Sequence, residues 1–146
     1  MITLQIINDF DNKIKLSDQL IKRVISNVVS SESKYSDINI SIIICNDEYL
    51  RNLKIKYFDM DILTDVITFN LSDNQKDLDA EIYISWERVC DNANIYNDRV
   101  NNEFKRVIIH GCLHLVGYED STKEEQENMR GKEKEYMDKV IKDIIL

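Results

Sequence analysis

The stretch IIHGCLHLVGYED, residues 108–120, is the most constrained part of the chain. It contains the only two histidines, His110 and His114, and two of the three glycines. We expect a helix from about Glu103 to Val116, because Gly117 suits the left-handed backbone position that commonly ends a helix. The two histidines are four residues apart, so one helical turn places both rings on the same face of that helix.

Two imidazoles at this spacing can bind one tetrahedral metal ion. Zinc enzymes usually use three protein ligands and leave the fourth position to water. The turn after the helix could bring Glu119 or Asp120 back toward the histidines, so both are candidates for the third ligand. Cys112 lies on the far side of the helix, and we expect it in the core. The alternative interpretation is that His110 and His114 are ordinary helix residues that bind no metal.

Apolar patterns elsewhere predict a single small α+β domain over residues 1–146, in which about four strands form a mixed sheet with four to five helices. The metal site would lie on a helix of the C-terminal half and on the following turn. The expected strands are Thr3–Asn8, Ile38–Cys45, Asp65–Phe69 and Glu81–Ser85. The residues expected to cap helix starts are Ser17, Asn46, Ser85, Asn101 or Asn102, and Thr122.

Three details of this prediction depend on local patterns. Leu71–Asp79 is polar and indicates a connection between strands. Thr122 and Glu125 have the spacing of a capping box and begin a last helix that reaches about Ile144. The inward face of the helix after Asn46 is expected to consist of Leu50, Leu53 and Tyr57.

The composition is that of an ordinary soluble globular protein. The 146 residues, 43% of them hydrophobic, suffice for one domain with a real core. No apolar run is long enough for a membrane span, and residues 1–15 lack the pattern of a signal peptide, so we expect a cytoplasmic protein without a membrane partner. The three widely spaced cysteines form neither a disulfide framework nor a CxxC metal motif.

The histidine stretch resembles the HGxLHLxGYDH signature of the YbeY-type endoribonucleases, a bacterial family of ribosomal RNA maturation factors. The likeness runs from His110 to Asp120 and is specific. Weaker likenesses extend the resemblance over most of the chain. Thr64–Phe69 is similar to the family's TDVLSF strand, and Glu81–Ser85 is similar to its GDIxIS strand, although Ala80-Glu81 replaces Gly-Asp. In the last helix, Met129, Arg130 and Glu133 match the family's MRxxE pattern.

The resemblance implies a metal-dependent hydrolase, usually zinc-dependent, that cuts single-stranded RNA. It implies a role in the maturation of ribosomal RNA, particularly at the 3′ end of the small ribosomal subunit's RNA, and in ribosome quality control. His110 and His114 would be the first two Zn²⁺ ligands. Asp120 stands where most members have the third histidine, and Glu119 replaces the preceding aspartate. Aspartate is an acceptable zinc ligand, but its charge should make the activated water less acidic.

Phe58 is a second departure, because many members of the family carry an arginine there. If that arginine holds phosphate, Lys54, Lys56 or Arg88 would have to substitute for it. The formal net charge of −8 argues against a surface covered with phosphate-binding residues but allows a local basic groove. We therefore expect acidic residues to gather on the last helix, with the three basic residues above and Arg106 nearer the cleft.

The general base is not evident from the sequence. In HExxH zinc peptidases the base follows the first histidine, but Gly111 occupies that position here, which disfavours a peptidase. Glu119 is a candidate base, although a solvated turn residue is the alternative. The 2′-hydroxyl of RNA could serve as the nucleophile instead. Asp65 could orient a ligand histidine or only turn the chain.

Other residues near the histidines allow two interpretations each. Trp86 could stack on bases but is expected to pack against the core. Lys105 and Arg106 could line a phosphate path but are expected to serve surface solubility. Two other functions also fit the sequence. One is a metallohydrolase with a non-RNA substrate, and the other is a non-catalytic or otherwise specialised metal-binding protein associated with the ribosome.

Overall fold

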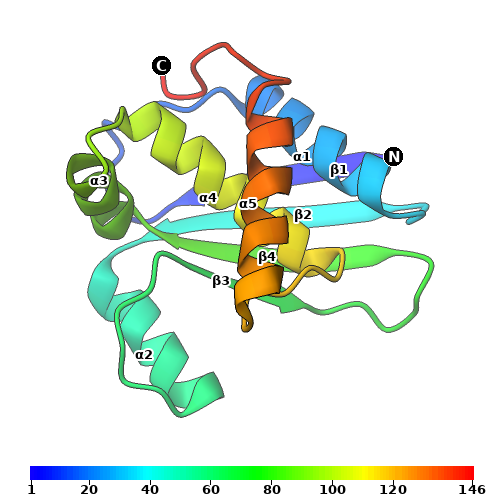
Figure 1. The fold of residues 1–146 in the computed structure, drawn as a ribbon, viewed down its shortest axis with the longest axis horizontal. Coiled ribbons are helices and arrows are strands. Elements are labelled where there is room, and N and C mark those ends of the chain that lie inside the picture. Colours follow the sequence, from blue (N-terminus) through cyan, green and yellow to red (C-terminus); the bar gives the residue numbers. More distant parts are fainter.

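A four-stranded mixed sheet lies at the centre of the molecule, with the strand order β1-β2-β4-β3 (Figure 1). The structure is a computed structural model that describes residues 1–146. Strands β1 (Ile2–Asn8), β2 (Ile38–Cys45) and β4 (Leu78–Ser85) are parallel, and β3 (Val66–Asn70) pairs antiparallel with β4 at one edge. The α+β class with a mixed sheet is therefore confirmed.

Five helices surround the sheet, and α4 (Val100–Leu115) occupies the central place among them. Helix α4 contacts α1 (Asp18–Glu32), α3 (Trp86–Ile95), α5 (Lys123–Met137) and both β3 and β4. Figure 1 shows α1, α4 and α5 on one side of the sheet and α2 (Asp47–Phe58) on the other. None of these helices combines the length and the apolar character needed to cross a membrane.

Four of the expected helix caps are confirmed. In each case the side chain of the cap accepts a hydrogen bond from a backbone N–H of the first turn, which would otherwise lack a partner. Thr122 and Glu125 form the complete capping box, because each side chain accepts from the backbone of the other. The other three caps are Ser17, Asn46 and Ser85.

The predicted start of α4 and the predicted end of α5 are wrong, and the C-terminal segment is involved in both errors. Helix α4 begins at Val100 with Arg99 at the cap position, and the Asn101 side-chain oxygen accepts from the N–H groups of Ile144 and Ile145 instead of capping the helix. Helix α5 ends at Met137, and the chain after it pairs with residues 15–17 in an extended bridge. These contacts are long-range and leave no local signal.

Two further details are wrong near β4 and α2. The strand β4 begins at Leu78, because Leu78 and Ala80 are buried opposite β2 while Asp79 is exposed between them. In α2, Leu50 is buried as expected, but the Tyr57 side chain is 56% exposed. Its ring meets the edge of Phe69 instead of entering the core.

Gly111 determines how closely α4 approaches the sheet. A Cβ atom there would lie 3.3 Å from the Cγ2 atoms of both Ile82 and Thr68. The absence of a side chain therefore lets the helix rest directly on β3 and β4. This contact brings the two flanking histidines to the edge of the sheet.

Candidate metal centre

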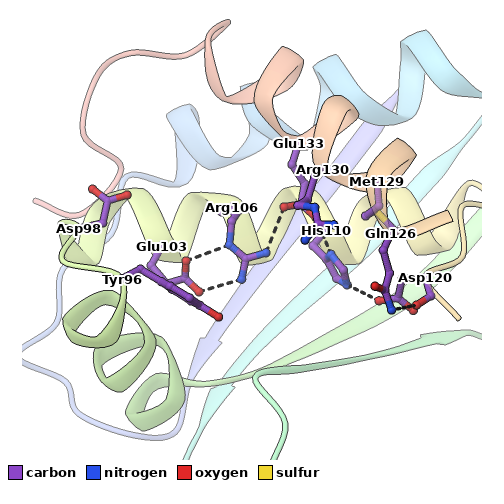
Figure 2. A pocket seen from close by; sticks show the side chains of 10 residues that line it. All are labelled: Tyr96, Asp98, Glu103, Arg106, His110, Asp120, Gln126, Met129, Arg130 and Glu133. Carbon is purple, nitrogen blue, oxygen red and sulfur yellow. Dashed lines mark hydrogen bonds and ion pairs between the residues drawn. The ribbon is translucent and has the colours of Figure 1, made fainter. Parts of the chain in front are cut away.

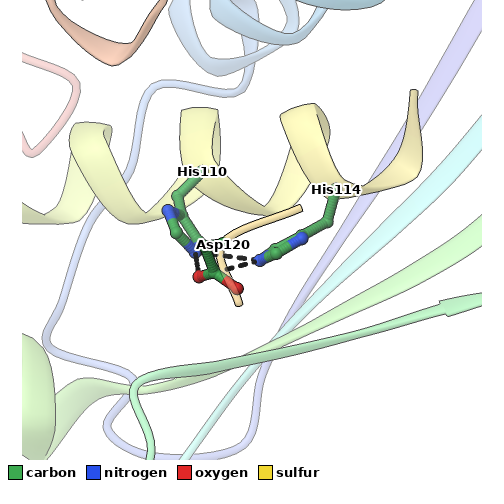
Figure 3. Close-up of side chains that lie close together, drawn as sticks. All are labelled: His110, His114 and Asp120. Atoms are coloured by element: carbon green, nitrogen blue, oxygen red, sulfur yellow. Dashed lines mark hydrogen bonds and ion pairs between the residues drawn. The ribbon is translucent and has the colours of Figure 1, made fainter. Parts of the chain in front are cut away.

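Three side chains converge where α4 meets the loop that follows it (Figure 3). The Nε2 atoms of His110 and His114 are 3.0 Å apart, and they lie 3.3 and 3.5 Å from Oδ2 of Asp120. Ligands about 2.0–2.1 Å from a tetrahedral zinc ion are separated from one another by about 3.3 Å. The donor set thus has the dimensions of a site for one metal ion.

The hydrogen bonds of the two rings show which nitrogens are free to bind a cation. Nδ1 of His114 lies 3.0 Å from the carbonyl oxygen of Tyr118, which can only accept, so this nitrogen carries the proton. Nδ1 of His110 lies 2.7 Å from a carboxylate oxygen of Glu133 and donates to it in the same way. With Nδ1 engaged in each ring, Nε2 is the nitrogen that a neutral ring offers to a metal ion. The two Nε2 atoms face each other and Asp120.

Glu133 on α5 is the residue that orients His110. It also accepts from Arg106 at 3.1 Å, and Arg106 in turn binds Glu103 at 2.8 Å (Figure 2). Burial alone would lower the pKa of His110, but the hydrogen bond to Glu133 and its negative charge outweigh burial and raise it. A carboxylate behind a ligand histidine fixes the ring and increases its basicity as a ligand.

In the sequence, Asp65 was the one candidate for this orienting role, with turning the chain as the alternative. The structure instead places the Asp65 carboxylate 3.5 Å from Arg106, and burial raises its pKa. A signal for Glu133 was present, because it lies on the buried stripe of α5 between Met129 and Tyr136. An acidic residue on an apolar helix face requires a partner, and here that partner is a histidine.

The loop that carries Asp120 is fixed at both ends. Gly117 adopts φ +107°, a value that side chains disfavour, and reverses the chain after α4. The Tyr118 hydroxyl donates to Glu32 at 2.6 Å, and the Gln126 amide donates to the Asp120 carbonyl at 3.0 Å. Glu119 points into solvent and is not among the three residues of the cluster.

Two cavities border this triad. One, of about 360 Å³, is lined by the triad, Lys54, Phe58 and residues 64–68. The other, of about 470 Å³, lies between α4 and α5 and includes Arg106 and Arg130 (Figure 2). His110 and Asp120 line both cavities.

The three basic residues expected to bind substrate lie at different distances from the triad. Lys54 lines the smaller cavity directly. Lys56 lies outside it, with its ammonium 5.2 Å from the centre of the Tyr57 ring. The Arg88 guanidinium is bound by Asp47 at 3.1 Å and by Asp91, and Arg88 lines neither cavity.

The remaining sequence predictions near the histidines have mixed outcomes. Cys112 is fully buried in the core, as expected, and it is not among the three residues of the cluster. Trp86 packs edge-on against Phe104, which confirms a packing role. The surface role predicted for Lys105 is wrong, because this side chain is buried and donates to the Val140 carbonyl. Arg106 belongs to the ion pairs behind His110.

Known proteins resemble this chain over most of its length. Residues 6–141 match the family described as Endoribonuclease YbeY. The Endoribonuclease YbeY proteins of Amoebophilus asiaticus and Cytophaga hutchinsonii are 45% and 39% identical, over 87% and 84% of this chain and 86% of each relative. The solution structure of TM1509 from Thermotoga maritima superimposes with a TM-score of 0.62 at 26% identity, covering 94% of this chain and 89% of that one. This chain therefore belongs to the YbeY endoribonuclease family.

Proposed function

We propose that this protein is a zinc-dependent endoribonuclease that cuts single-stranded RNA during the maturation of ribosomal RNA in the cytoplasm, with the small ribosomal subunit as its partner. The family relationship supports the reaction and the class of substrate. The convergence of His110, His114 and Asp120 between two cavities is the observation that carries the proposal. Because two cavities border the triad, we expect an RNA strand to occupy both and to continue beyond the cleaved bond.

The chain's own residues hold the substrate and the ligands in place. A bound zinc ion would act as a Lewis acid and lower the pKa of water for attack on the phosphodiester. The Lys54 ammonium lies in the smaller cavity, where it can pair with a phosphate beside the triad. Glu133 and the Tyr118 carbonyl hold the ring nitrogens that face away from the substrate.

A proton acceptor is also available in the smaller cavity. Asp65 lines this cavity together with Lys54 and the triad, and its carboxylate is half-buried. Glu119, the acceptor suggested by the sequence, is exposed and lines neither cavity. Asp65 is therefore better placed than Glu119 to accept a proton from water or from a 2′-hydroxyl.

The decisive experiment combines elemental analysis with cleavage assays on the purified protein. We expect about one zinc ion per chain and cleavage of a single-stranded oligoribonucleotide, but not of the same strand in a duplex. His114→Ala should lose most of its metal and at least about 100-fold in cleavage rate, because two ligands hold the ion poorly. Glu127→Ala changes an exposed residue of α5 that lines neither cavity at the triad and serves as the control.

Each competing function gives a different result in this experiment. Full metal content in folded His114→Ala contradicts the ligand assignment. Bound metal with turnover of a peptide or small ester, but not of RNA, indicates a hydrolase of another class. Bound metal without any turnover indicates a ribosome-associated protein that uses the ion only for its structure.

A further inference from the structure

Exposed apolar side chains are concentrated on one segment of the molecule. Of the fourteen large hydrophobic residues with exposed side chains, seven lie in residues 49–63, on α2 and the loop after it. Helix α2 is also the helix on the open side of the sheet (Figure 1). The seven residues are Tyr49, Ile55, Tyr57, Phe58, Met60, Ile62 and Leu63. Apolar patches of this kind usually mark a binding surface.

A continuous series of aromatic rings runs from the metal centre through this surface to the half-buried side chains of Phe69 on β3 and Tyr83 on β4. Phe58 is 44% exposed and lines the smaller cavity together with His110, His114 and Asp120. Its ring stacks on Phe69 at a centroid distance of 6.2 Å, and Phe69 also contacts the rings of Tyr57 and Tyr83. We call Phe58, Tyr57, Phe69 and Tyr83 the aromatic platform.

The net charge of this segment is positive although the protein as a whole is acidic. The ammonium of Lys54 lies 4.5 Å from the centre of the Phe58 ring, and that of Lys56 lies 5.2 Å from the centre of the Tyr57 ring. Neither lysine forms an ion pair. Residues 49–63 contain three basic and two acidic residues, whereas the whole chain has a net charge of −8.

We propose that the aromatic platform binds unpaired bases of the RNA strand by stacking, while Lys54 and Lys56 bind the adjoining phosphates. Rings beside flexible cations are the arrangement that single-stranded nucleic acid requires, since every base has a flat face and every link has a charge. A duplex hides the faces of its bases, so the platform selects single strands. This inference rests on the proposed function, because the platform continues from the cavity at the triad.

The test measures KM and kcat for a single-stranded oligoribonucleotide of about twelve nucleotides, and its dissociation constant in a His114→Ala background that does not cut it. Phe58→Ala should raise KM and the dissociation constant about tenfold with little change in kcat, since stacking on a base that takes no part in bond cleavage stabilises ground and transition states alike. Phe58→Trp should retain the parent values. Phe10→Ala, which removes an exposed phenylalanine on a different loop, should also leave them unchanged.

A strand with one abasic site identifies the contact as base stacking. The abasic site is placed at each position of the strand in turn. At one position it should weaken binding to the parent protein about tenfold. The same strand should bind Phe58→Ala almost as well as the intact strand does, because this variant has already lost the stack. The proposal is overturned if the abasic site weakens RNA binding equally in the parent and in Phe58→Ala. It is also overturned if neither Phe58→Ala nor Tyr57→Ala changes the affinity for RNA. If Phe58→Ala instead abolishes self-association in sedimentation while RNA affinity stays constant, the surface docks a second copy of this chain and the platform assignment is wrong.

These outcomes separate the platform from the nuclease activity. If the parent cuts RNA and Phe58→Ala has the same KM, the platform is rejected and the enzyme assignment stands. If the parent binds single strands through Phe58 but cuts none, the platform stands and the enzyme assignment is rejected. If the parent neither binds nor cuts RNA, both are rejected.

Discussion

Asp120 gives this candidate metal centre a carboxylate where a neutral imidazole is usual in the signature that the chain resembles. Two imidazoles and one carboxylate leave a divalent ion with about one positive charge fewer than three imidazoles do. The backbone at Asp120 is held in place, because its carbonyl accepts a hydrogen bond from the Gln126 side-chain amide. We expect an ion bound by Asp120 to be a weaker Lewis acid, so that the catalysed reaction requires a higher pH.

Two substitutions of Asp120 test this effect. Asp120→His should keep the metal and shift the rising limb of the pH–rate profile to lower pH, because the more positive site acidifies water more strongly. Asp120→Ala should lower zinc affinity about 10- to 100-fold. Competition titration with a zinc chelator and cleavage rates between pH 5 and 9 provide the measurements. If Asp120→Ala binds zinc as tightly as the parent, Asp120 is not a ligand and Glu119 becomes the next candidate.

Glu133 should act on the metal through His110 without touching it. Burial would raise the pKa of Glu133, but the hydrogen bond from His110 and the charge of Arg106 lower it, so the residue is a carboxylate at neutral pH. Glu133→Ala should weaken zinc binding about 10- to 100-fold, and Glu133→Gln by less, because its amide oxygen still accepts from Nδ1. Glu127→Gln, on the exposed face of the same helix, is the control. Unchanged zinc affinity in Glu133→Ala would show that His110 needs no orienting partner.

At the scale of helices and strands, the sequence predicts those features that depend only on neighbouring residues. The caps at Ser17, Asn46, Ser85 and Thr122 were identifiable because each acts within four residues of itself. The histidine pair was identifiable for the same reason, since the helical repeat alone places both rings on one face. The close approach of α4 to the sheet depends on the missing side chain of Gly111, but no local pattern identifies β3 and β4 as its partners.

The features that the sequence did not predict depend on contacts between distant segments. Asparagine is a common helix cap, but the Asn101 side chain accepts hydrogen bonds from the backbone of residues 144 and 145, more than forty positions away. Lys105 has the character of a surface residue, but its ammonium is covered by the same C-terminal segment. Glu133 reaches His110 only because α5 packs across α4. In each case the side chain's partner is set by tertiary packing, which no local pattern contains.

Glu32 connects three elements and should make their association pH-dependent. It ends α1 and accepts hydrogen bonds from Tyr118, in the loop before Asp120, and from Tyr136 and Lys132 on α5. Burial would raise the pKa of Glu32, but these hydrogen bonds outweigh it and lower the pKa below its ordinary value. The folded state then binds fewer protons than the unfolded state. The stabilisation is complete above the unfolded pKa and is lost as the pH falls through the folded pKa.

We therefore expect Glu32→Gln to lower the free energy of unfolding by about 2 kcal/mol at pH 7 and by much less below pH 4. Urea denaturation of the parent and the variant at several pH values measures the difference. Glu135→Gln removes an exposed carboxylate from the same region and should show no such convergence. A destabilisation by Glu32→Gln that is constant from pH 7 to pH 3 would mean that the charge of Glu32 contributes nothing to the association of α1 and α5.

At the scale of the whole molecule, the distribution of charge limits how this protein can hold RNA. The chain has 27 acidic and 19 basic residues. Several of the basic residues are already engaged: Arg88 by Asp47 and Asp91, and Arg106 by Glu103 and Glu133. Lys54 and Arg130 line the two cavities at the triad, and Lys56 lies on the aromatic platform. Only about three phosphates of a bound strand can therefore be neutralised, and base stacking must supply the remainder of the affinity.

This balance predicts an unusually shallow dependence of RNA binding on salt. For single strands, the logarithm of the binding constant falls by about 0.7 per phosphate contact for each tenfold rise in salt, so three contacts give a slope of about −2. Lys54→Gln and Lys56→Gln should each reduce this slope by about 0.7, whereas Phe58→Ala should lower affinity without changing it. Fluorescence anisotropy from 50 to 500 mM KCl measures the slope, with Lys142→Gln as an exposed control. A slope much steeper than −2 would require more phosphate contacts than these three side chains provide, and would move the RNA path away from α2.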